Sequence, residues 1–541
     1  MQKKLRVVIA ALALLSLVAG GAWACTVFGV GRKASANGTA MISHSCDSLT
    51  DTFQLHLIPA ADHAKGSMRD LQKEGRGINR GDKPELLPIQ IPEVEHTYRY
   101  LTCRYPFLNE KGLAMGESTM SMSVTDERSK KVQEVMETNA FGLMNCLIIQ
   151  DIALERAATA REAVLVMGSL ISEYGWYEAG ETMPITDGNE VWIFEAYGNK
   201  MWAAWRVPDD EIFVAANRAR LRELDLSDKR NVICAPDMID YAVEQGFIDR
   251  KDVNEKCFSP ADVFYPTIRL YSTLREWRAL TLFAPSVKLD PYAYYFPKSV
   301  KPDRAVTVAD LFKVYGDWYE GTEFDLSKGL VAGPYGNPNR YRKALNMGFN
   351  DNEFPRAIND YRHTYVQICE VNASLPEEVR GMVWFGYGAA DTTYLTPLWA
   401  VMKDLPEQFK VGTRMEPFDG RSAWWECVRV QHIAEMRYQD IRKEILDYRT
   451  PIMEENFKKA YSFQAKAAEM IKAGKSDEAL NLLSEFSSET AKAWHQGWAD
   501  LGNKLFSKYC MNATHMKYKS YPAEWGKLIS NGPFLRPDGT K

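Results

Sequence analysis

The chain has 541 residues, of which 46% are hydrophobic and 25% are charged, and its formal net charge is −5. This is the composition of an ordinary globular protein, and the length allows one large domain or two to four smaller ones. No basic stretch or basic domain stands out, so the composition argues against nucleic acid as a partner. No clear internal repeat or low-complexity segment is present.

The first 24 residues have the three-part layout of a secretory signal peptide. A positive head at residues 3–6 precedes the almost wholly apolar residues 7–20, and an A-x-A cleavage site at residues 22–24 lies directly before Cys25. We therefore expect cleavage after residue 24 and export to the periplasm or the cell exterior. An uncleaved anchor is disfavoured because a span needs about 20 apolar residues. A lipoprotein signal is disfavoured because Ala22 stands where such signals usually carry Leu.

No later stretch is long and apolar enough to cross a bilayer, so we expect no stable membrane insertion after cleavage. The nine cysteines are widely spaced without a C-x-x-C pair, and the eight histidines form no H-E-x-x-H or similar motif. We therefore expect no metal and no other cofactor. An oxidising compartment would permit disulfides, but their pairing does not follow from the spacing.

The predicted elements of the processed chain begin with a hairpin. Residues 26–30 and 39–43 are predicted strands, and the intervening residues 33–38 end in an Asn-Gly pair suited to positive φ. Such a hairpin would tie the new N-terminus into a sheet, whereas most chain ends fray. Residues 66–92, rich in Gly, Pro and charge, are predicted to form an exposed loop.

Further along, apolar residues recur at helical spacing over 160–174, and Gly175 can end that helix. Three strands are predicted next, in one antiparallel run: 190–197, 201–207 and 211–216. Asn217 would lie at the end of the third strand.

The second half of the chain is predicted to be mainly loops and then helices. Residues 285–345 are rich in Pro, Tyr and Gly, which indicates long covering loops, and residues 422–508 have a mainly helical pattern. The whole pattern predicts an α+β protein, with antiparallel sheets and helices packed on their outer faces.

Cleavage after residue 24 would leave the α-amino group of Cys25 next to its own thiol. A free α-amine has a pKa of about 7.7–8.0 and a thiol one of about 8.5. The amine can therefore take the thiol proton, directly or through one water, and later donate it to a leaving amine. The thiolate would attack a carbonyl carbon, and water would resolve the thioester. The alternative is that Cys25 merely follows a cleavage site or forms a disulfide.

Such a nucleophile needs two supports. Asp47, just past the second predicted strand, could hold the α-amine with its carboxylate, or it could merely cap a turn. Asn217 offers a side-chain amide that could donate to the oxyanion of the reaction, or it could merely cap a loop.

Several segments also carry a family resemblance, and they occur in one order along the chain: CTVFGVGRKAS at 25–35, SCDS at 45–48, GLAMGEST at 112–119, RVPDD at 206–210 and ANR at 216–218, YEGT at 319–322, GPYGNP at 333–338, GAADTTY at 388–394 and SAWW at 422–425. Together they resemble the dipeptidase A family of cysteine N-terminal-nucleophile (Ntn) hydrolases. Secernins and, more distantly, penicillin V acylases and bile salt hydrolases share the opening segment.

The resemblance implies a four-layered αββα Ntn-hydrolase sandwich over residues 25–440, with residues 441–541 as a mainly helical extension packed on the same domain. It also implies metal-free hydrolysis of short peptides, typically dipeptides.

By position, the resemblance gives Cys25 the role of nucleophile, Asp47 that of the group near its amine, and Asn217 that of the oxyanion donor. Acylase relatives have an arginine three residues before this aspartate, where the present chain has His44. His44 either takes over part of that role or is merely a buried, hydrogen-bonded histidine.

Two further residues are candidates for substrate binding. An arginine of the family matches either Arg275 or Arg278. Glu117, in a segment that lines the site in relatives, could contact a substrate amine, although a surface carboxylate is the ordinary alternative.

Three functions remain open at this point. The first is an exported dipeptidase acting on small peptides, and the second is an N-acyl amidase of the same chemistry. The third is a non-catalytic exported binding protein, which the His44 departure keeps open. A homo-oligomer also remains open.

Overall fold

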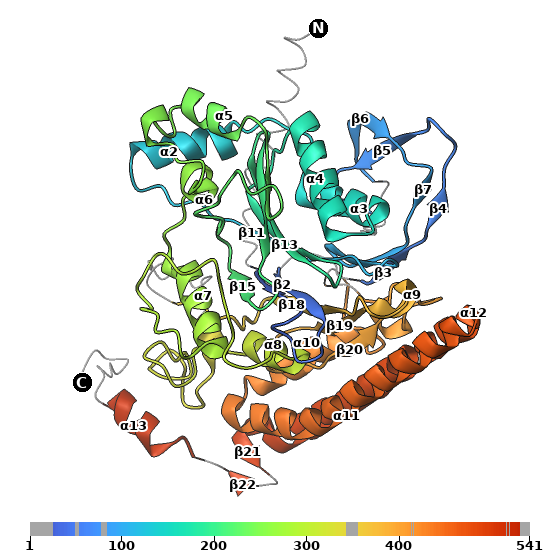
Figure 1. The fold of residues 1–541 in the computed structure, drawn as a ribbon. Helices are drawn as coiled ribbons and strands as arrows, with labels where there is room; N and C mark the ends of the chain where they lie inside the picture. Colours follow the sequence, from blue (N-terminus) through green and yellow to red (C-terminus); the bar gives the residue numbers. More distant parts are fainter. Residues whose placement is uncertain are drawn as a thin grey trace.

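The computed structural model describes residues 25–48, 54–76, 84–341, 355–412, 414, 416–514, 517–518 and 520–530. The predicted signal peptide lies outside these described residues. The architecture is α+β, with two large antiparallel sheets and a helical C-terminal region (Figure 1). Among the helices of the described residues, none has the length and apolar character that crossing a membrane requires.

The first sheet has seven strands in the order β17-β15-β1-β2-β18-β19-β20. Their bounds are Thr26–Val30 (β1), Ala40–Asp47 (β2), Ile212–Ala215 (β15), Ser299–Val300 (β17), His363–Val371 (β18), Gly381–Tyr387 (β19) and Thr396–Leu398 (β20). The predicted opening hairpin is confirmed, because β1 and β2 pair antiparallel with Thr26 opposite Ser45. Strand β1 is central, with β2 on one side and β15 on the other.

The second sheet has nine strands, in the order β16-β14-β13-β12-β10-β9-β8-β3, with β11 paired to β12. Their bounds are His56–Ile58 (β3), Tyr100–Thr102 (β8), Pro106–Asn109 (β9), Ala114–Met115 (β10), Ser118–Thr119 (β11), Glu181–Thr186 (β12), Val191–Gly198 (β13), Met201–Val207 (β14) and Val232–Cys234 (β16).

One of the three strands predicted in a single run belongs to the other sheet. Strands β13 and β14 pair with each other as expected. Strand β15 instead crosses to the first sheet and pairs with β1. The crossing follows Pro208, where a turn brings Glu211 to accept a hydrogen bond from the Gly31 backbone N–H at 3.0 Å. A local strand pattern predicts a strand but not its partner.

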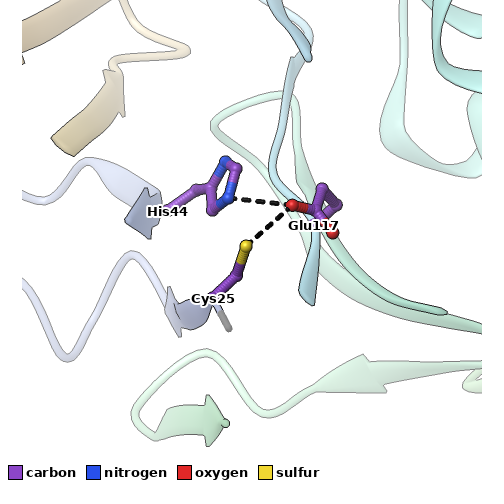
Figure 2. Close-up of side chains that lie close together, drawn as sticks. All are labelled: Cys25, His44 and Glu117. Carbon is purple, nitrogen blue, oxygen red and sulfur yellow. Dashed lines mark hydrogen bonds and ion pairs between the residues drawn. The ribbon is translucent and has the colours of Figure 1, made fainter. Parts of the chain in front are cut away.

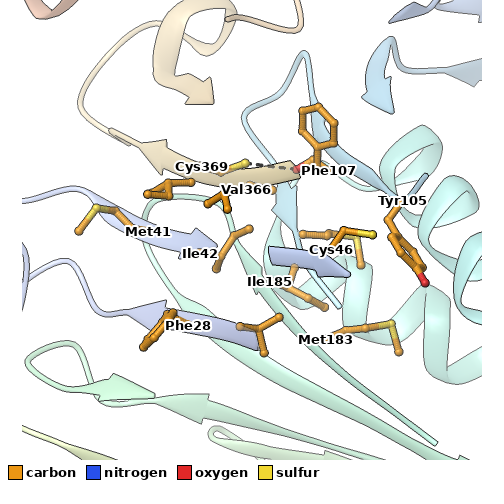
Figure 3. Close-up of a cluster of buried hydrophobic side chains, with 14 of the residues drawn as sticks. Phe28, Met41, Ile42, Cys46, Tyr105, Phe107, Met183, Ile185, Val366 and Cys369 are labelled. Carbon is orange, nitrogen blue, oxygen red and sulfur yellow. Dashed lines mark hydrogen bonds between the residues drawn. The ribbon is translucent and has the colours of Figure 1, made fainter. Parts of the chain in front are cut away.

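The two sheets pack face to face, and the apolar core lies between them. Strands β1 and β2 contact β12 and β13. Ile42 and Cys369 of the first sheet face the second sheet (Figure 3), whose Val191 and Ile193 lie next to Gly29 of β1. Burying each such side chain stabilises the fold by roughly 1.5–3 kcal/mol. All eight residues of β2 are buried.

Helices cover the outer faces of both sheets. Against the second sheet, α3 (Cys146–Arg156) packs on β9 and α4 (Ala160–Tyr174) packs on β13 and β14. Against the first sheet, α7 packs on β15, α8 on β18 and α10 on β19, with bounds Leu270–Phe283 (α7), Val308–Tyr315 (α8) and Ala423–Ala434 (α10). The predicted helix at 160–174 is confirmed, including its end at Gly175, which has φ 75°.

Two long helices form the C-terminal region (Figure 1). Helix α11 (Tyr438–Lys472) packs along α12 (Ser476–Tyr509), and α12 also contacts β20 and α10. The ring of Trp494 stacks on that of Tyr394 with centroids 4.7 Å apart. The predicted helical character of residues 422–508 is confirmed, and the helices are packed against the first sheet.

The remaining elements are short: α2 (Glu127–Gln133), α5 (Met238–Glu244), α6 (Pro260–Phe264), α9 (Glu377–Arg380), α13 (Ala523–Ser530), β4 (Ala61–Asp62), β5 (Met68–Gln72), β6 (Leu86–Pro92), β7 (His96–Thr97), β21 (Ala513–Thr514), β22 (Lys517–Tyr518), the 3-10 turns Arg250–Asp252, Pro338–Arg340, Glu407–Phe409 and Cys510–Asn512, and the π-turn Glu134–Thr138.

Two regions predicted as loops contain regular structure. Residues 66–92 include the paired strands β5 and β6, although residues 77–83 lie outside the described chain. Residues 285–345 include β17 and α8, and α8 begins with a capping box between Thr307 and Asp310. The high Gly and Pro content of these regions obscured short elements whose stability comes from tertiary packing.

Candidate active site

Cys25 lies between the two sheets, directly before β1. The register of β1 and β2 continues outward from the Thr26–Ser45 pair, so Cys25 lies opposite Cys46. Because side chains alternate between the faces of a strand, His44 and Cys46 share one face of β2. Glu117, between β10 and β11 of the second sheet, meets His44 from the other side of the gap.

Cys25, His44 and Glu117 meet at one carboxylate oxygen (Figure 2). The Cys25 thiol donates to Oε1 of Glu117 at 3.0 Å, and Nε2 of His44 lies 3.0 Å from the same oxygen. All three side chains are fully buried. The structure therefore brings together Cys25, the predicted nucleophile, and two of the predicted substrate-binding residues.

The charges of the three groups are linked. Burial opposes a charge on His44, but the neighbouring Cys25 and Glu117 outweigh it and raise the pKa of His44 to about 9. Burial likewise opposes a charge on Glu117, yet His44 holds the pKa of Glu117 below its usual value. His44 and Glu117 thus form a buried ion pair at neutral pH.

The Cys25 thiol is strongly held in its neutral form. Burial is the main reason that its pKa lies well above the usual value, with the thiol of Cys46 and the charge of Glu117 adding to the effect. Activation of the thiol therefore requires a further base.

We expect the His44–Glu117 pair to stabilise the protein most below about pH 6.5 and to lose this effect as the pH rises to about 9. The folded pKa of His44, about 9, lies above its unfolded value of about 6.5. Its contribution is therefore complete below about pH 6.5, lost as the pH rises through about 9, and of order 3 kcal/mol at most. Besides Cys25 and Glu117, the phenol rings of Tyr105 and Tyr365 face His44.

Urea unfolding of the unsubstituted protein and of His44→Gln at pH 6 and pH 10 measures this effect. The difference in free energy of unfolding should shrink at pH 10. The matched control is His432→Gln, at an exposed position of α10, which should show little difference at either pH. An equal loss for His44→Gln at both pH values would contradict the ion-pair account.

Arg275 of α7 lies behind Cys25, and all five of its N–H groups donate hydrogen bonds within the protein. Its Nη1 donates to the Cys25 carbonyl at 2.9 Å and to Oγ1 of Thr26 at 3.0 Å. Its Nη2 donates to the Ala216 carbonyl at 3.2 Å and to Oδ1 of Asn217 at 2.8 Å, while Nε bonds a carbonyl one helical turn back. These contacts favour a positioning role over the substrate contact expected from the sequence.

The geometry also separates the two candidate arginines. Arg278 lies one turn further along α7 and donates to both carboxylate oxygens of Asp317, at 2.9 and 2.7 Å. Of the two, Arg275 is therefore the one at the site.

Asn217 lies at the site in a left-handed conformation, with φ 57°. Asparagine adopts this region more readily than most residues. Its backbone N–H donates to Oγ of Ser118 at 2.9 Å, and the Ser118 hydroxyl donates to the Cys25 carbonyl at 3.2 Å. Its side-chain Nδ2 donates to the Thr119 carbonyl at 2.6 Å. Ser118 was missed by the sequence analysis, where the only signal was its place beside Glu117.

Asp47 has partners that the sequence analysis did not foresee. It follows Cys46 in β2, so its side chain points to the opposite face from His44. Arg356 donates to its Oδ2, and Nε2 of His363 lies 3.2 Å from its Oδ1. These contacts anchor Asp47 beside the end of β1, and none of its described contacts is to Cys25 itself. Both partners lie more than 300 residues away in the sequence.

The described residues include two groups with metal-ligand atoms within 4.8 Å of one another. One is Cys25, His44 and Glu117, and the other is Cys146, Glu178 and Glu181. Thiol, imidazole and carboxylate are the donors that zinc uses. In the first group, however, the atoms already bond to one another, with the thiol as donor and Glu117 as acceptor.

Cys25 is buried, its carbonyl accepts hydrogen bonds from Arg275 and Ser118, and its thiol contacts Glu117. A fixed thiol beside polar side chains is an arrangement typical of cysteine-type hydrolases. Residues 24–450 match the family model of Peptidase family C69. The chain therefore belongs to Peptidase family C69, and it is a cysteine-type peptidase. The family resemblance found in the sequence is confirmed.

The chain is similar over most of its length to proteins named as dipeptidases. It is 26% identical over 445 residues to a "Probable dipeptidase" of Latilactobacillus sakei, covering 80% of this chain and 85% of that protein. It is 22% identical over 509 residues to a "Probable dipeptidase A" of Streptococcus pyogenes serotype M3, covering 90% and 100%. It is also 22% identical to "Dipeptidase A" of Lactobacillus helveticus over 391 residues, covering 71% and 77%.

Proposed function

We propose that the chain is an exported cysteine dipeptidase whose nucleophile is Cys25, set free at the N-terminus by removal of residues 1–24. The observation that carries this proposal is the fixation of Cys25, which directly follows an A-x-A site and whose carbonyl is held by Arg275 and Ser118. The family and the names of the similar proteins support dipeptides as substrates.

In the proposed reaction, the α-amine of Cys25 accepts the thiol proton and the sulfur attacks the carbonyl carbon of the scissile amide. The amide side chain of Asn217 donates to the oxygen that becomes negative. As the C–N bond breaks, the proton passes to the departing amine and a thioester remains. Water then attacks the thioester, which releases the acid and restores the thiol. Asp47, anchored by Arg356 and His363, supports the new α-ammonium group.

The proposal includes the αββα sandwich of Ntn hydrolases. Its support is the face-to-face packing of the two sheets. Helices α7, α8 and α10 cover the outer face of the first sheet, and α3 and α4 cover that of the second. We assign residues 25–440 to the catalytic domain and residues 441–541 to a helical extension on the same domain. The contacts of α12 with β20 and α10 support this assignment.

The test is an assay of the protein purified from the exported fraction. N-terminal sequencing should begin at Cys25, and a dipeptide panel should be hydrolysed. Iodoacetamide should stop turnover, while chelators should leave it unchanged. Hydrolysis of N-acyl amino acids without dipeptides would favour the amidase alternative, and ligand binding without turnover would favour an exported binding protein. An N-terminus other than Cys25, or a lipid on Cys25, would contradict the mechanism.

A further inference from the structure

A buried carboxylate that the sequence analysis did not single out lies next to the site. Glu181 begins β12 and is the register partner of Thr119 in β11. Glu117 is two residues before Thr119, so alternation along the strand places Glu117 and Glu181 on the same face. The charge of Glu117 acts directly on Glu181 and, after burial, is one cause of the raised pKa of Glu181. Glu181 is thus a second carboxyl group behind the one that contacts Cys25.

Glu181 is buried with unused hydrogen-bonding capacity. Its side chain is 1% exposed, and its Oε2 has no hydrogen-bond partner among the described residues. Burial, with the nearby charges of Glu117 and Glu178, raises the pKa of Glu181 well above its usual value. Buried polar atoms are normally satisfied, and a buried carboxylate needs a positive partner to remain charged.

The positive charge of His44 is already paired with Glu117 and not with Glu181. His44 is 3.0 Å from Glu117, which leaves Glu181 and Glu178 as additional carboxyl groups beside that pair. Glu178 has its own donor, the backbone N–H of Cys146 at the start of α3, at 3.1 Å. Glu181 is therefore the member of the group best placed to receive a cation from outside the protein.

The distance from the nucleophile indicates which cation fits. A substrate carbonyl carbon must come within about 3–3.5 Å of the Cys25 sulfur, and the α-nitrogen of the same residue is about 2.5 Å from that carbon. Hydrogen bonds add about 2.8–3.2 Å. Glu117 is one hydrogen bond from the sulfur, at 3.0 Å, and Glu181 lies beside Glu117, opposite Thr119 in the register of β11 and β12. This spacing suits an α-ammonium group and is short for the end of an extended lysine side chain.

We propose that Glu181, together with Glu117, binds the free α-ammonium group of the substrate residue whose carbonyl is attacked by Cys25. The enzyme then selects peptides with an unblocked N-terminus and discriminates against N-acyl substrates. This inference rests on the proposed dipeptidase function and names the residues that recognise its substrates.

The test compares Ala-Ala with propionyl-Ala, which has the same scissile amide but lacks the ammonium group. The unsubstituted enzyme should prefer Ala-Ala by about 100-fold or more in kcat/KM, because a site built for a polar group discriminates strongly against its absence. Glu181→Gln should lower kcat/KM for Ala-Ala by at least about tenfold and leave that for propionyl-Ala within about threefold, since the amide keeps the shape but not the charge.

The matched control is Glu195→Gln, in β13 of the same sheet. Glu195 is also buried, but its oxygens accept hydrogen bonds from the backbone N–H groups of Arg220 and Leu221, at 2.6 and 3.2 Å. Its replacement should affect both substrates equally and leave the preference unchanged. Circular dichroism and thermal melting of each variant establish that it is folded.

Three outcomes would overturn the inference. One is a ratio of kcat/KM for Ala-Ala to kcat/KM for propionyl-Ala near 1 in the unsubstituted enzyme. This measurement needs no variant. Another is an equal loss on both substrates in Glu181→Gln, which would place the effect on the nucleophile or its own amine. The third is loss of Ala-Ala turnover in EDTA with recovery in zinc, which would make Cys146, Glu178 and Glu181 a metal site. An unsubstituted enzyme that cleaves neither substrate would overturn the proposed function as well, so the two failures are distinguishable.

Discussion

Replacement of Cys25 by Ala is expected to abolish dipeptide hydrolysis, with a loss in kcat on the order of 10⁴-fold or more, because the sulfur forms the covalent bond to the substrate. The thiol is buried and its contacts run to Glu117, so the shorter side chain also leaves the His44–Glu117 pair intact. The variant should therefore remain folded. Measurements of kcat, with circular dichroism on the same samples, check both parts of the expectation.

The matched control is Cys257→Ala, because Cys257 is an exposed thiol. This variant should keep full activity and should still lose it on treatment with iodoacetamide. Full turnover in Cys25→Ala would mean that another group carries out the attack and would contradict the proposed mechanism.

A single residue retained before Cys25 is expected to reduce activity by about 10²–10⁴-fold, the range that a positioned general base contributes. The reason is chemical, because an acylated nitrogen has no basic lone pair, while burial keeps the pKa of the thiol high. Two otherwise identical proteins, one beginning at Cys25 and one at an added Gly, should be compared for kcat on Ala-Ala and for thermal stability.

The protein with the added Gly should melt close to the unextended one, since Arg275 and Ser118 contact the carbonyl of Cys25 and not its nitrogen. Equal turnover in the two proteins would show that the α-amine is dispensable, and His44 would become the base to test next.

The fold was predictable where the periodicity was local and strong. The opening hairpin, the helix that ends at Gly175 and the helices after residue 422 follow from patterns within short windows. The assignment of β15 to the first sheet was not predictable in this way, because its pairing with β1 joins residues that are far apart in the sequence. The hairpin of β5 and β6 was obscured by its Gly- and Pro-rich surroundings.

The residues of the site also fall into two groups, those that the sequence indicated and those that it did not. Position relative to the cleavage site pointed to Cys25, and the family resemblance pointed to His44, Glu117 and Asn217, which the structure brings to the same place. Arg356 and Glu181 were missed, since each reaches the site from a separate element and has no distinctive neighbours in the sequence. Arg275 was found, but its use of every N–H within the protein could only be seen in the structure.

The central place of β1 has a consequence for the lifetime of the proposed processed protein. Aminopeptidases trim exposed chain ends, and they need a flexible segment to bind. Here the residues after Cys25 are flanked by β2 and β15, so the amide protons of β1 should exchange with solvent only when the sheet itself opens. The proposed nucleophile would thereby be protected from trimming by the same backbone hydrogen bonds that hold β1 in the sheet.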